Sequence, residues 1–403
     1  WIPSQVHAAA AADDRLDVAV IGIGMRGKYL IAILPVSIRV TALCDCSLDE
    51  IETARKPKDR FETLLASFAG GDGATAAIYQ DYRVMLDRQR FDAVIIAAPD
   101  HHHAGAAILA MRAGCDVYVE KPLAVTIAEG RAIIEAAQKY ERVVQVGSQQ
   151  RTMAANRRAC EFIRAGGLGR ISRVEERNFP GPMPYDPQMF PGEPVPKRLD
   201  WDLFCGPTPR RTYNRHLWVK DAFDVGYLQW RGWDLFRDYS GHLMTNWGAH
   251  SVDMIQYALG KDATGPSEIK LHPQQLDDFT DDQWHQKTPP LGSLADRKTD
   301  RMRFCPLTMV YSDGTIVEFK PGVRRTKFYG EKGTLTLSRN RYRTAPVDLL
   351  PPPSAAENAV WAGDGHVARP HLENWVDAMR SLALPNAPIE VGHRSITVCH
   401  LAN

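Results

Sequence analysis

The sequence lacks long apolar runs and any concentration of charge of one sign. No segment holds about 18 consecutive apolar residues, so we expect no membrane span. Lys and Arg number 49 against 48 Asp and Glu, which gives a net charge of +1 without a dense basic run. This balance argues against nucleic acid or an anionic membrane surface as the main partner.

Cysteine is also sparse. The seven cysteines are scattered, odd in number and contain no Cys-x-x-Cys pair. This pattern indicates neither a disulfide framework nor a zinc site, and we expect no bound metal.

The 403 residues are too many for one ordinary hydrophobic core. We therefore expect an N-terminal arm over residues 1–15, a first domain over 16–150 and a second domain over 151–403. The apolar fraction of 44% and the charged fraction of 24% are those of a globular protein, so each domain has enough apolar residues for its own core.

Short apolar segments alternate with helical ones across the first domain. The predicted strands are 16–21, 39–44, 91–98, 116–120 and 143–146, and the predicted helices are 26–34, 47–70, 81–89, 104–113 and 126–140. Residues 71–77 read as a loop. Nearly continuous apolar strands between helices predict an α/β fold whose parallel sheet is covered on both faces, as in a Rossmann domain.

The pattern changes in the second domain. A helix is predicted at 154–165 and a strand at 171–178, and nine prolines then exclude regular structure from 179–212. Strands at 303–311, 315–320 and 333–337, with hairpin signals at Asp313-Gly314 and Lys332-Gly333, predict an antiparallel sheet. Helices are predicted at 371–383 and 394–402.

A glycine-rich turn follows the first strand and opens the first helix. Its sequence is Gly22-Ile23-Gly24-Met25-Arg26-Gly27. In this context a GxGxxG segment predicts a dinucleotide site, because the glycines allow a tight turn and close approach of backbone to a pyrophosphate at the helix N-terminus. We take Gly22, Gly24, Met25, Arg26 and Gly27 as cofactor-binding residues; the alternative is a turn without function.

Asp45 ends the second strand, 18 residues after Gly27. A carboxylate there can accept hydrogen bonds from ribose hydroxyls and repel a 2′-phosphate, which favours NAD over NADP. The alternative is an Asp that caps the next helix.

Three adjacent histidines follow the third predicted strand, in Pro99-Asp100-His101-His102-His103. Their side chains diverge, so a metal site is disfavoured. We expect Pro99, Asp100 and His103 to contact the cofactor at the carboxyl edge of the sheet.

Two residues far apart in sequence can handle a proton. Lys121, in Glu120-Lys121-Pro122, follows the fourth predicted strand, where an ammonium can bind a substrate hydroxyl; the alternative is a surface lysine. His250 shares a helix face with Asn246 and Asp253 if this segment is helical, and an imidazole can accept the hydroxyl proton; the alternative is a core histidine.

The chain resembles the Gfo/Idh/MocA oxidoreductases, the family of glucose–fructose oxidoreductase and inositol dehydrogenase. The motifs that carry the resemblance are the glycine turn, Ala98 to His103, Glu120-Lys121-Pro122, Gly147 to Arg151, Gly241 to Asp253 and Gly392 to Ser395. The resemblance implies a Rossmann domain with bound NAD, then an α/β domain with a large open sheet that forms dimers or tetramers. It also implies Lys121 and His250 as catalytic residues that meet over the nicotinamide, and a Lys121-Pro122 bond that is often cis.

One position departs from the family pattern. The usual Asp-x-x-x-His has Asn246 as its first residue here, and an amide cannot ionise to raise the basicity of His250. We expect Asn246 to orient the substrate instead.

Polar and aromatic residues surround the expected site. Glu120, Lys121 and Gln149 are expected beside the cofactor. Four further residues suit a carbohydrate, whose hydroxyls bond polar groups while its ring stacks on aromatic faces. These four are Arg151, Tyr213, Arg231 and Trp233. Packing of the loop or a subunit interface is the alternative for each of them.

Three functions are compatible with these residues. The first is NAD-dependent oxidation of a hydroxyl on a sugar, polyol or glycoside. The second is an NAD-retaining glycosidase or lyase that oxidises the sugar transiently, eliminates the leaving group and returns the hydride. The third is a non-catalytic sensor of sugar or NAD, which the presence of both Lys121 and His250 disfavours.

The two ends of the chain bear on location. Residues 7–13, rich in alanine, are similar to the end of an export signal, so we expect a periplasmic protein; the alternative is a flexible arm of a cytoplasmic one. The start at Trp1 indicates processing or trimming, and the stop at Asn403 inside a predicted helix suggests a further C-terminal piece.

Overall fold

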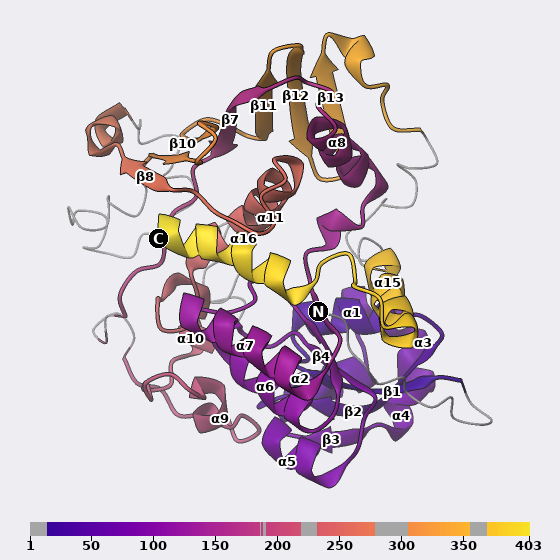
Figure 1. Cartoon of the computed structure of the whole chain (residues 1–403). Helices are drawn as coiled ribbons and strands as arrows, with labels where there is room; N and C mark the ends of the chain where they lie inside the picture. The colour runs from indigo at the N-terminus through magenta and orange to yellow at the C-terminus, as the bar shows by residue number, and fades with distance from the viewer. Residues whose placement is uncertain (1–13, 186, 188–190, 219–231, 279–304, 355–368) are drawn as a thin grey trace. The chain divides into compact units, whose positions relative to one another are not determined.

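The computed structural model describes residues 14–185, 187, 191–218, 232–278, 305–354 and 369–403. They form two compact units (Figure 1). Unit 1 holds the described residues of Trp1–Gln149, Pro194–Arg211 and Trp361–His393, and unit 2 holds the others. The sequence predicts one boundary after residue 150, whereas the chain returns twice to unit 1. We describe each unit by itself.

Unit 1 is built on a six-stranded parallel sheet in the order β3-β2-β1-β4-β5-β6. The strands are β1 (Leu16–Ile21), β2 (Ile38–Cys44), β3 (Ala77–Tyr79), β4 (Ala93–Ile96), β5 (Asp116–Val119) and β6 (Val144–Val146). The predicted Rossmann sheet is confirmed. The sequence missed β3, because three residues are too few to show a period.

Helices cover both faces of this sheet. The core on one face joins β1 and β2 to α1 (Met25–Ala32), α2 (Leu48–Arg55), α3 (Glu62–Gly70) and α15 (Arg369–Ser381). The opposite face carries α5 (Tyr82–Arg88), α6 (His103–Arg112) and α7 (Ile127–Tyr140). Thr126 and Glu129 form a capping box that begins α7.

Three local predictions in unit 1 were wrong. The helix predicted over 47–70 is interrupted, because Pro57 disfavours helical backbone at Lys56; α2 ends at Arg55 and a 3-10 turn spans Asp59–Phe61. Residues 71–77 are not all loop, since they include the short helix α4 (Asp72–Thr75). The proline-rich segment 179–212, expected to lack regular structure, holds a short helix, α9 (Trp201–Cys205), because no proline lies between Pro196 and Pro207 and the Asp200 side chain caps the helix.

Unit 2 is built on a seven-stranded sheet in the order β13-β12-β11-β7-β10-β9-β8. Its strands are β7 (Ile171–Arg177), β8 (Glu268–Leu271), β9 (Leu307–Val310), β10 (Ile316–Lys320), β11 (Thr326–Gly330), β12 (Gly333–Ser338) and β13 (Arg341–Ala345). Of its described pairings only β7 with β10 is parallel. The mostly antiparallel sheet is confirmed, although β8, β11 and β13 were not foreseen.

One face of this sheet packs on two helices, α8 (Ala154–Arg164) and α11 (His242–Ala258). Strand residues alternate, so Val174, Val317 and Phe328 are buried beneath the helices. The other face is half-exposed and carries ion pairs between neighbouring strands, such as Arg173 with Glu318. Two further helices are α10 (Arg215–Trp218) and α16 (Ile389–Ala402).

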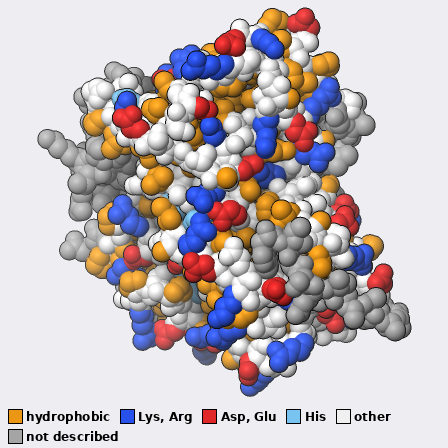
Figure 2. Space-filling view, in the orientation of Figure 1, with side chains coloured by type: hydrophobic (Ala, Val, Ile, Leu, Met, Phe, Trp, Pro, Cys, Tyr) orange, Lys and Arg blue, Asp and Glu red, His pale blue; other side chains and the backbone are white. Residues whose placement is uncertain are grey.

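Surface charge follows the balanced composition. On the face drawn in Figure 2, basic and acidic side chains are interspersed rather than gathered by sign. Among the helices that the structure describes, none has the length and apolar character needed to cross a bilayer.

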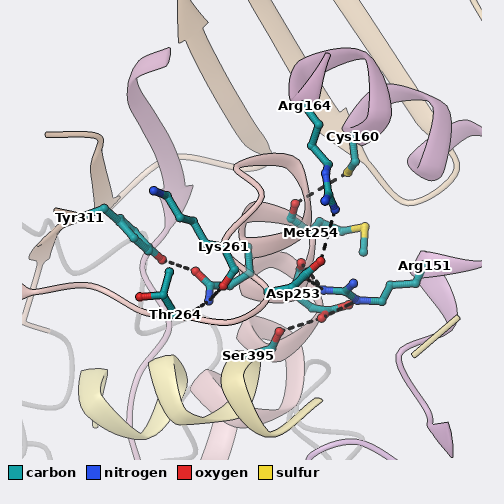
Figure 3. Close-up of polar contacts among 11 residues, drawn as sticks. Arg151, Cys160, Arg164, Asp253, Met254, Lys261, Thr264, Tyr311 and Ser395 are labelled. Atoms are coloured by element: carbon teal, nitrogen blue, oxygen red, sulfur yellow. Dashed lines mark hydrogen bonds and ion pairs between the residues drawn. The ribbon is translucent and has the colours of Figure 1, made fainter. Parts of the chain in front are cut away.

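Unit 2 contains a buried ion pair between Arg151 and Asp253 (Figure 3). The Nε of Arg151 donates to both carboxylate oxygens of Asp253, each at 2.9 Å, and these side chains are only 5% and 2% exposed. Ser395 Oγ of α16 donates to the same carboxylate at 2.7 Å, and Arg151 Nη2 donates to Asp262 at 2.8 Å. The Arg151 guanidinium also lies over the Tyr257 ring, at 4.8 Å.

These contacts join distant parts of the chain. Arg151 precedes α8, Asp253 lies on α11 and Ser395 lies on α16. A buried charge is tolerated only where its partners remain in place, so the network specifies how these three segments pack.

We predict that Asp253→Ala destabilises unit 2 by about 3–5 kcal/mol, because it leaves the Arg151 guanidinium buried with only part of its counter-charge. The matched control is Glu268→Ala, which removes an exposed pair with Lys270 and should cost less than about 1 kcal/mol. Urea denaturation followed by circular dichroism measures both variants. Equal transition midpoints would contradict a structural role for the buried pair.

Candidate active site

The glycine turn between β1 and α1 is too close-packed for side chains at two positions. Gly22 has a φ of +87°, and a Cβ there would lie 2.3 Å from the backbone nitrogen of Ala98. A Cβ on Gly27 would lie 2.0 Å from the carbonyl oxygen of Gly22. No side chain caps the N-terminus of α1, where Gly24 is the N-cap residue. The first turn of this helix contains no acidic residue. The positive end of the helix is thus open to a phosphate, as a dinucleotide requires.

Asp45 lies directly after β2 and beside this turn. Its Oδ2 accepts from the backbone amide of Ile23 at 2.7 Å, and its Oδ1 accepts from the amide of Ser47 at 2.8 Å. The N-cap of α2 is Ser47 and not Asp45, so the capping alternative does not describe this residue. The carboxylate instead adds negative charge next to the turn, where a 2′-phosphate would be repelled.

The buried carboxylate of Glu120 joins three segments at the carboxyl edge of the sheet. Its Oε1 accepts from Arg26 Nε at 2.8 Å and from Gln149 Nε2 at 2.9 Å. Tyr118 Oη donates to the same oxygen at 3.3 Å and accepts from Gln149 at 2.9 Å. The predicted cofactor residues Arg26, Glu120 and Gln149 are therefore hydrogen-bonded to one another.

Lys121 follows Glu120 at this edge and is partly exposed. Its backbone amide donates to Glu120 Oε2 at 3.3 Å, and the Lys121–Pro122 peptide is cis. Within unit 1 the lysine therefore follows directly on the glutamate that contacts α1, the helix opened by the glycine turn.

The three adjacent histidines contact backbone carbonyls. His101 and His102 each place Nε2 2.8 Å from the carbonyl oxygen of Phe204 in α9. His103 lies between the carbonyls of Ala98 and Pro122, at 2.9 and 2.6 Å. Burial lowers the pKa of His103, so its neutral ring donates to one carbonyl at a time. These contacts account for the histidines through packing; Pro99 and Asp100 complete the same turn at the sheet edge.

His250 lines a pocket of about 310 Å³ within unit 2. One face of α11 provides Trp247, His250, Ser251 and Met254, at the spacing of a single helical stripe. The remaining lining residues are Gln150, Glu176, Arg177, Phe179, Arg324, Arg325, Thr326, Leu337, Ser338 and Arg339. The pocket thus sets an imidazole beside an exposed indole and several guanidinium groups.

The sequence places Asn246, His250 and Asp253 on one face of α11, but these residues have different surroundings in the structure. Asn246 and Asp253 are buried on α11 but do not line this pocket, and Asp253 faces Arg151. The spacing of four residues from Asn246 to His250 placed them on one face, yet the pocket lies on the side of Trp247 and Ser251.

The four predicted substrate residues outside α11 have different surroundings. Arg151 is held in the buried ion pair, so its contacts account for it without a substrate. Tyr213 is buried beside Asn214, whose side chain donates to the carbonyl of Pro191 at 2.8 Å. Trp233 lies in a 3-10 turn (Gly232–Leu235). Arg231 lies outside the described residues.

Sequence reasoning missed several pocket and edge residues. Tyr118 read as an ordinary strand residue, and Glu176 and Arg324 carried no motif. The only available signal was the pair Arg324-Arg325, which directly precedes a strand that was itself not predicted. The pocket residues come together only once β7, β11 and β12 are aligned.

Two family models match the chain. They are the oxidoreductase family, NAD-binding Rossmann fold, over residues 16–148, and the oxidoreductase family, C-terminal alpha/beta domain, over residues 186–288. Both belong to the Gfo/Idh/MocA family, and they follow one another in the order that the fold requires.

Among curated proteins, an inositol 2-dehydrogenase of Salmonella paratyphi B is 30% identical over 168 residues. The match covers 41% of this chain and 46% of that relative, so the chain spans about half the length of the relative it matches.

Solved structures share the fold over almost the whole chain. The WlbA dehydrogenase of Bordetella pertussis, in complex with NADH and UDP-GlcNAcA, has a TM-score of 0.62 at 16% identity and covers 98% of this chain and 96% of its own. A levoglucosan dehydrogenase in complex with NADH and levoglucosan has a TM-score of 0.59 at 17% identity, covering 96% and 95%. With the two family models and the glycine turn, these findings show that the chain belongs to the Gfo/Idh/MocA oxidoreductases, with an NAD-binding Rossmann domain.

Proposed function

We propose that this protein is an NAD-dependent oxidoreductase that oxidises a CH–OH group of a sugar or polyol. The observation that carries the proposal is the hydrogen-bonded group around Glu120, which connects α1 at the glycine turn with the segment that holds Lys121. The inositol and levoglucosan dehydrogenases similar to this chain support the substrate class.

The chain's own residues have separate roles in this proposal. NAD, when bound, supplies the acceptor for the hydride. The open N-terminus of α1 holds the pyrophosphate, and Asp45 holds the ribose. Lys121 Nζ donates to the substrate hydroxyl oxygen and stabilises the charge that develops there, while the His250 imidazole accepts the hydroxyl proton.

Assembly and location remain part of the proposal. We propose a homodimer or homotetramer formed through the half-exposed face of the unit 2 sheet. This face carries several ion pairs between side chains of the sheet. We also propose export to the periplasm; the residues that suggest it, 7–13, lie outside the described part of the chain.

The experiment that tests the activity has two parts. The nucleotide is first released from purified protein and identified; sugars, polyols and glycosides are then assayed for both NADH and leaving group. Steady NADH formation from one class of sugar supports the proposal. Release of a leaving group without net NADH would replace it by transient oxidation and elimination, and failure to bind NAD would contradict both.

We predict that Lys121→Ala lowers kcat by about 10²- to 10⁴-fold, because the substrate hydroxyl loses its proton-handling partner. NAD affinity should be retained, which fluorescence titration measures. Lys139→Ala, an exposed lysine on α7, is the control and should be near wild type. Unchanged turnover in Lys121→Ala would remove this residue from the mechanism.

His250→Gln should lower kcat to a similar extent, since an amide cannot accept the hydroxyl proton. Circular dichroism should show that α11 is intact. If the variant loses substrate affinity while kcat is kept, His250 binds the substrate and does not transfer the proton.

Asp45→Asn removes the charge beside the glycine turn and keeps an oxygen that can accept from Ile23. We predict that the preference for NAD over NADP then falls by about tenfold, because the repulsion of a 2′-phosphate is lost. Asp49→Asn, the same charge change on an exposed position of α2, should leave the preference unchanged. The ratio of kcat/KM for the two nucleotides is the measurement.

A further inference from the structure

The pocket beside His250 is rich in arginine. Arg177, Arg324, Arg325 and Arg339 all line it, with Glu176 as the one acidic side chain among the lining residues. Like charges gathered in one concavity repel one another, so a pocket lined in this way favours a ligand that carries negative charge.

Two of these arginines have no carboxylate partner in the described part of the chain. Arg324 and Arg325 are exposed in the loop just before β11, and neither takes part in an ion pair with a described residue. Arg173, on the neighbouring strand β7, lies by contrast within 3.6 Å of both Glu175 and Glu318. Within the described part of unit 2, the open face of the sheet thus carries paired charges, whereas Arg324 and Arg325 at the pocket have no ion pair.

The other two arginines lie against aromatic rings. The Arg339 guanidinium lies 5.7 Å from the centre of the Trp247 ring, and that of Arg177 lies 5.5 Å from the Phe179 ring. A guanidinium held on a ring face keeps its N–H groups in a defined plane. Trp247 is 45% exposed, so its ring is open to a ligand as well.

Glu176 offsets the charge of the arginines only in part. It is 2% exposed, and its carboxylate accepts from Thr326 Oγ1 at 2.5 Å and from the Arg177 amide at 2.8 Å. Burial raises the pKa of Glu176 to about 7, so a substantial fraction of this carboxyl is uncharged near neutral pH.

We propose that the substrate is anionic: a sugar or polyol that carries a carboxylate or phosphate group held by Arg324 and Arg325, with a hydroxyl presented to His250. This inference rests on the proposed oxidoreductase function and specifies its substrate class. The guanidinium fork binds either oxyanion through paired N–H groups, and the indole of Trp247 suits the CH face of a sugar ring. A pocket of about 310 Å³ matches a single sugar unit.

The test compares ligands that differ in charge on the same ring. A neutral hexose, its uronic acid and its 6-phosphate, each in the gluco, galacto and manno series, are titrated into the NAD-loaded protein by calorimetry. We expect at least one anion to bind about tenfold or more tightly than its neutral counterpart, with a preference that weakens as salt is added. The acid and phosphate arms show which oxyanion the pocket takes.

The variant is the double substitution Arg324→Gln and Arg325→Gln. It should weaken binding of the anion by about 10- to 100-fold, the loss typical of charge-assisted hydrogen bonds, and leave the neutral hexose and NAD unaffected. The matched control is Arg341→Gln with Arg343→Gln, two exposed arginines on β13 of the same sheet that do not line the pocket. The control should bind every ligand as wild type does.

The outcomes separate this inference from the proposed function. Neutral hexoses that bind as well as every anion, absence of anion binding, or an equal loss in the control variant overturns the inference. Oxidation of a neutral sugar to give NADH would still support the function in those cases. Anion binding that depends on Arg324 and Arg325, without NADH from any ligand, supports the anion site and overturns the proposed oxidation.

Discussion

The hydrogen bonds made by the Glu120 carboxylate are the constraint on which the unit 1 site depends. A buried carboxylate must find donors, and Arg26, Tyr118 and Gln149 supply them from three separate segments. The helix opened by the glycine turn, the end of β5 and the exit from β6 are thereby held at one edge of the sheet. Lys121 is the next residue after this glutamate, so the hydrogen bonds of the buried carboxylate also fix where the Lys121 backbone lies at this edge.

Backbone packing sets the second requirement at the same edge. A Cβ at Gly22 would overlap the backbone of Ala98, and one at Gly27 would overlap the carbonyl of Gly22. The turn is therefore closed against side chains while the amides at the start of α1 remain directed outward. Asp45 Oδ2 then accepts from the Ile23 amide, so this carboxylate supports the shape of the turn. In the proposed function the same carboxylate would also repel a 2′-phosphate.

Much of unit 1 was predictable because its signals are local. A buried parallel strand, a glycine turn and a helix follow one another within Leu16–Ala32, and each has a pattern of its own. Unit 2 depends on pairings between strands distant in sequence: β7 joins β10 and β11, about 140 and 150 residues later. The buried pair of Arg151 and Asp253 has the same origin, so Arg151 looked like a free polar group from sequence alone. The motif residues were found; the partners that determine their roles were not.

Unit 2 has two polar regions that contain arginine. The buried arginine has a structural role, and the exposed arginines at the pocket have the proposed role in substrate binding. Arg151 faces two carboxylates and a tyrosine ring, which compensate its charge inside the protein. Arg324 and Arg325 have no such compensation among the described residues and stay in contact with solvent at the pocket. Stability alone would favour an acidic neighbour or a neutral residue at these positions, because adjacent cations repel. Their retention beside His250 is explained if the missing negative charge arrives with the substrate. In that case binding and orientation have one cause, since the oxyanion that satisfies the arginines also fixes which hydroxyl faces the imidazole.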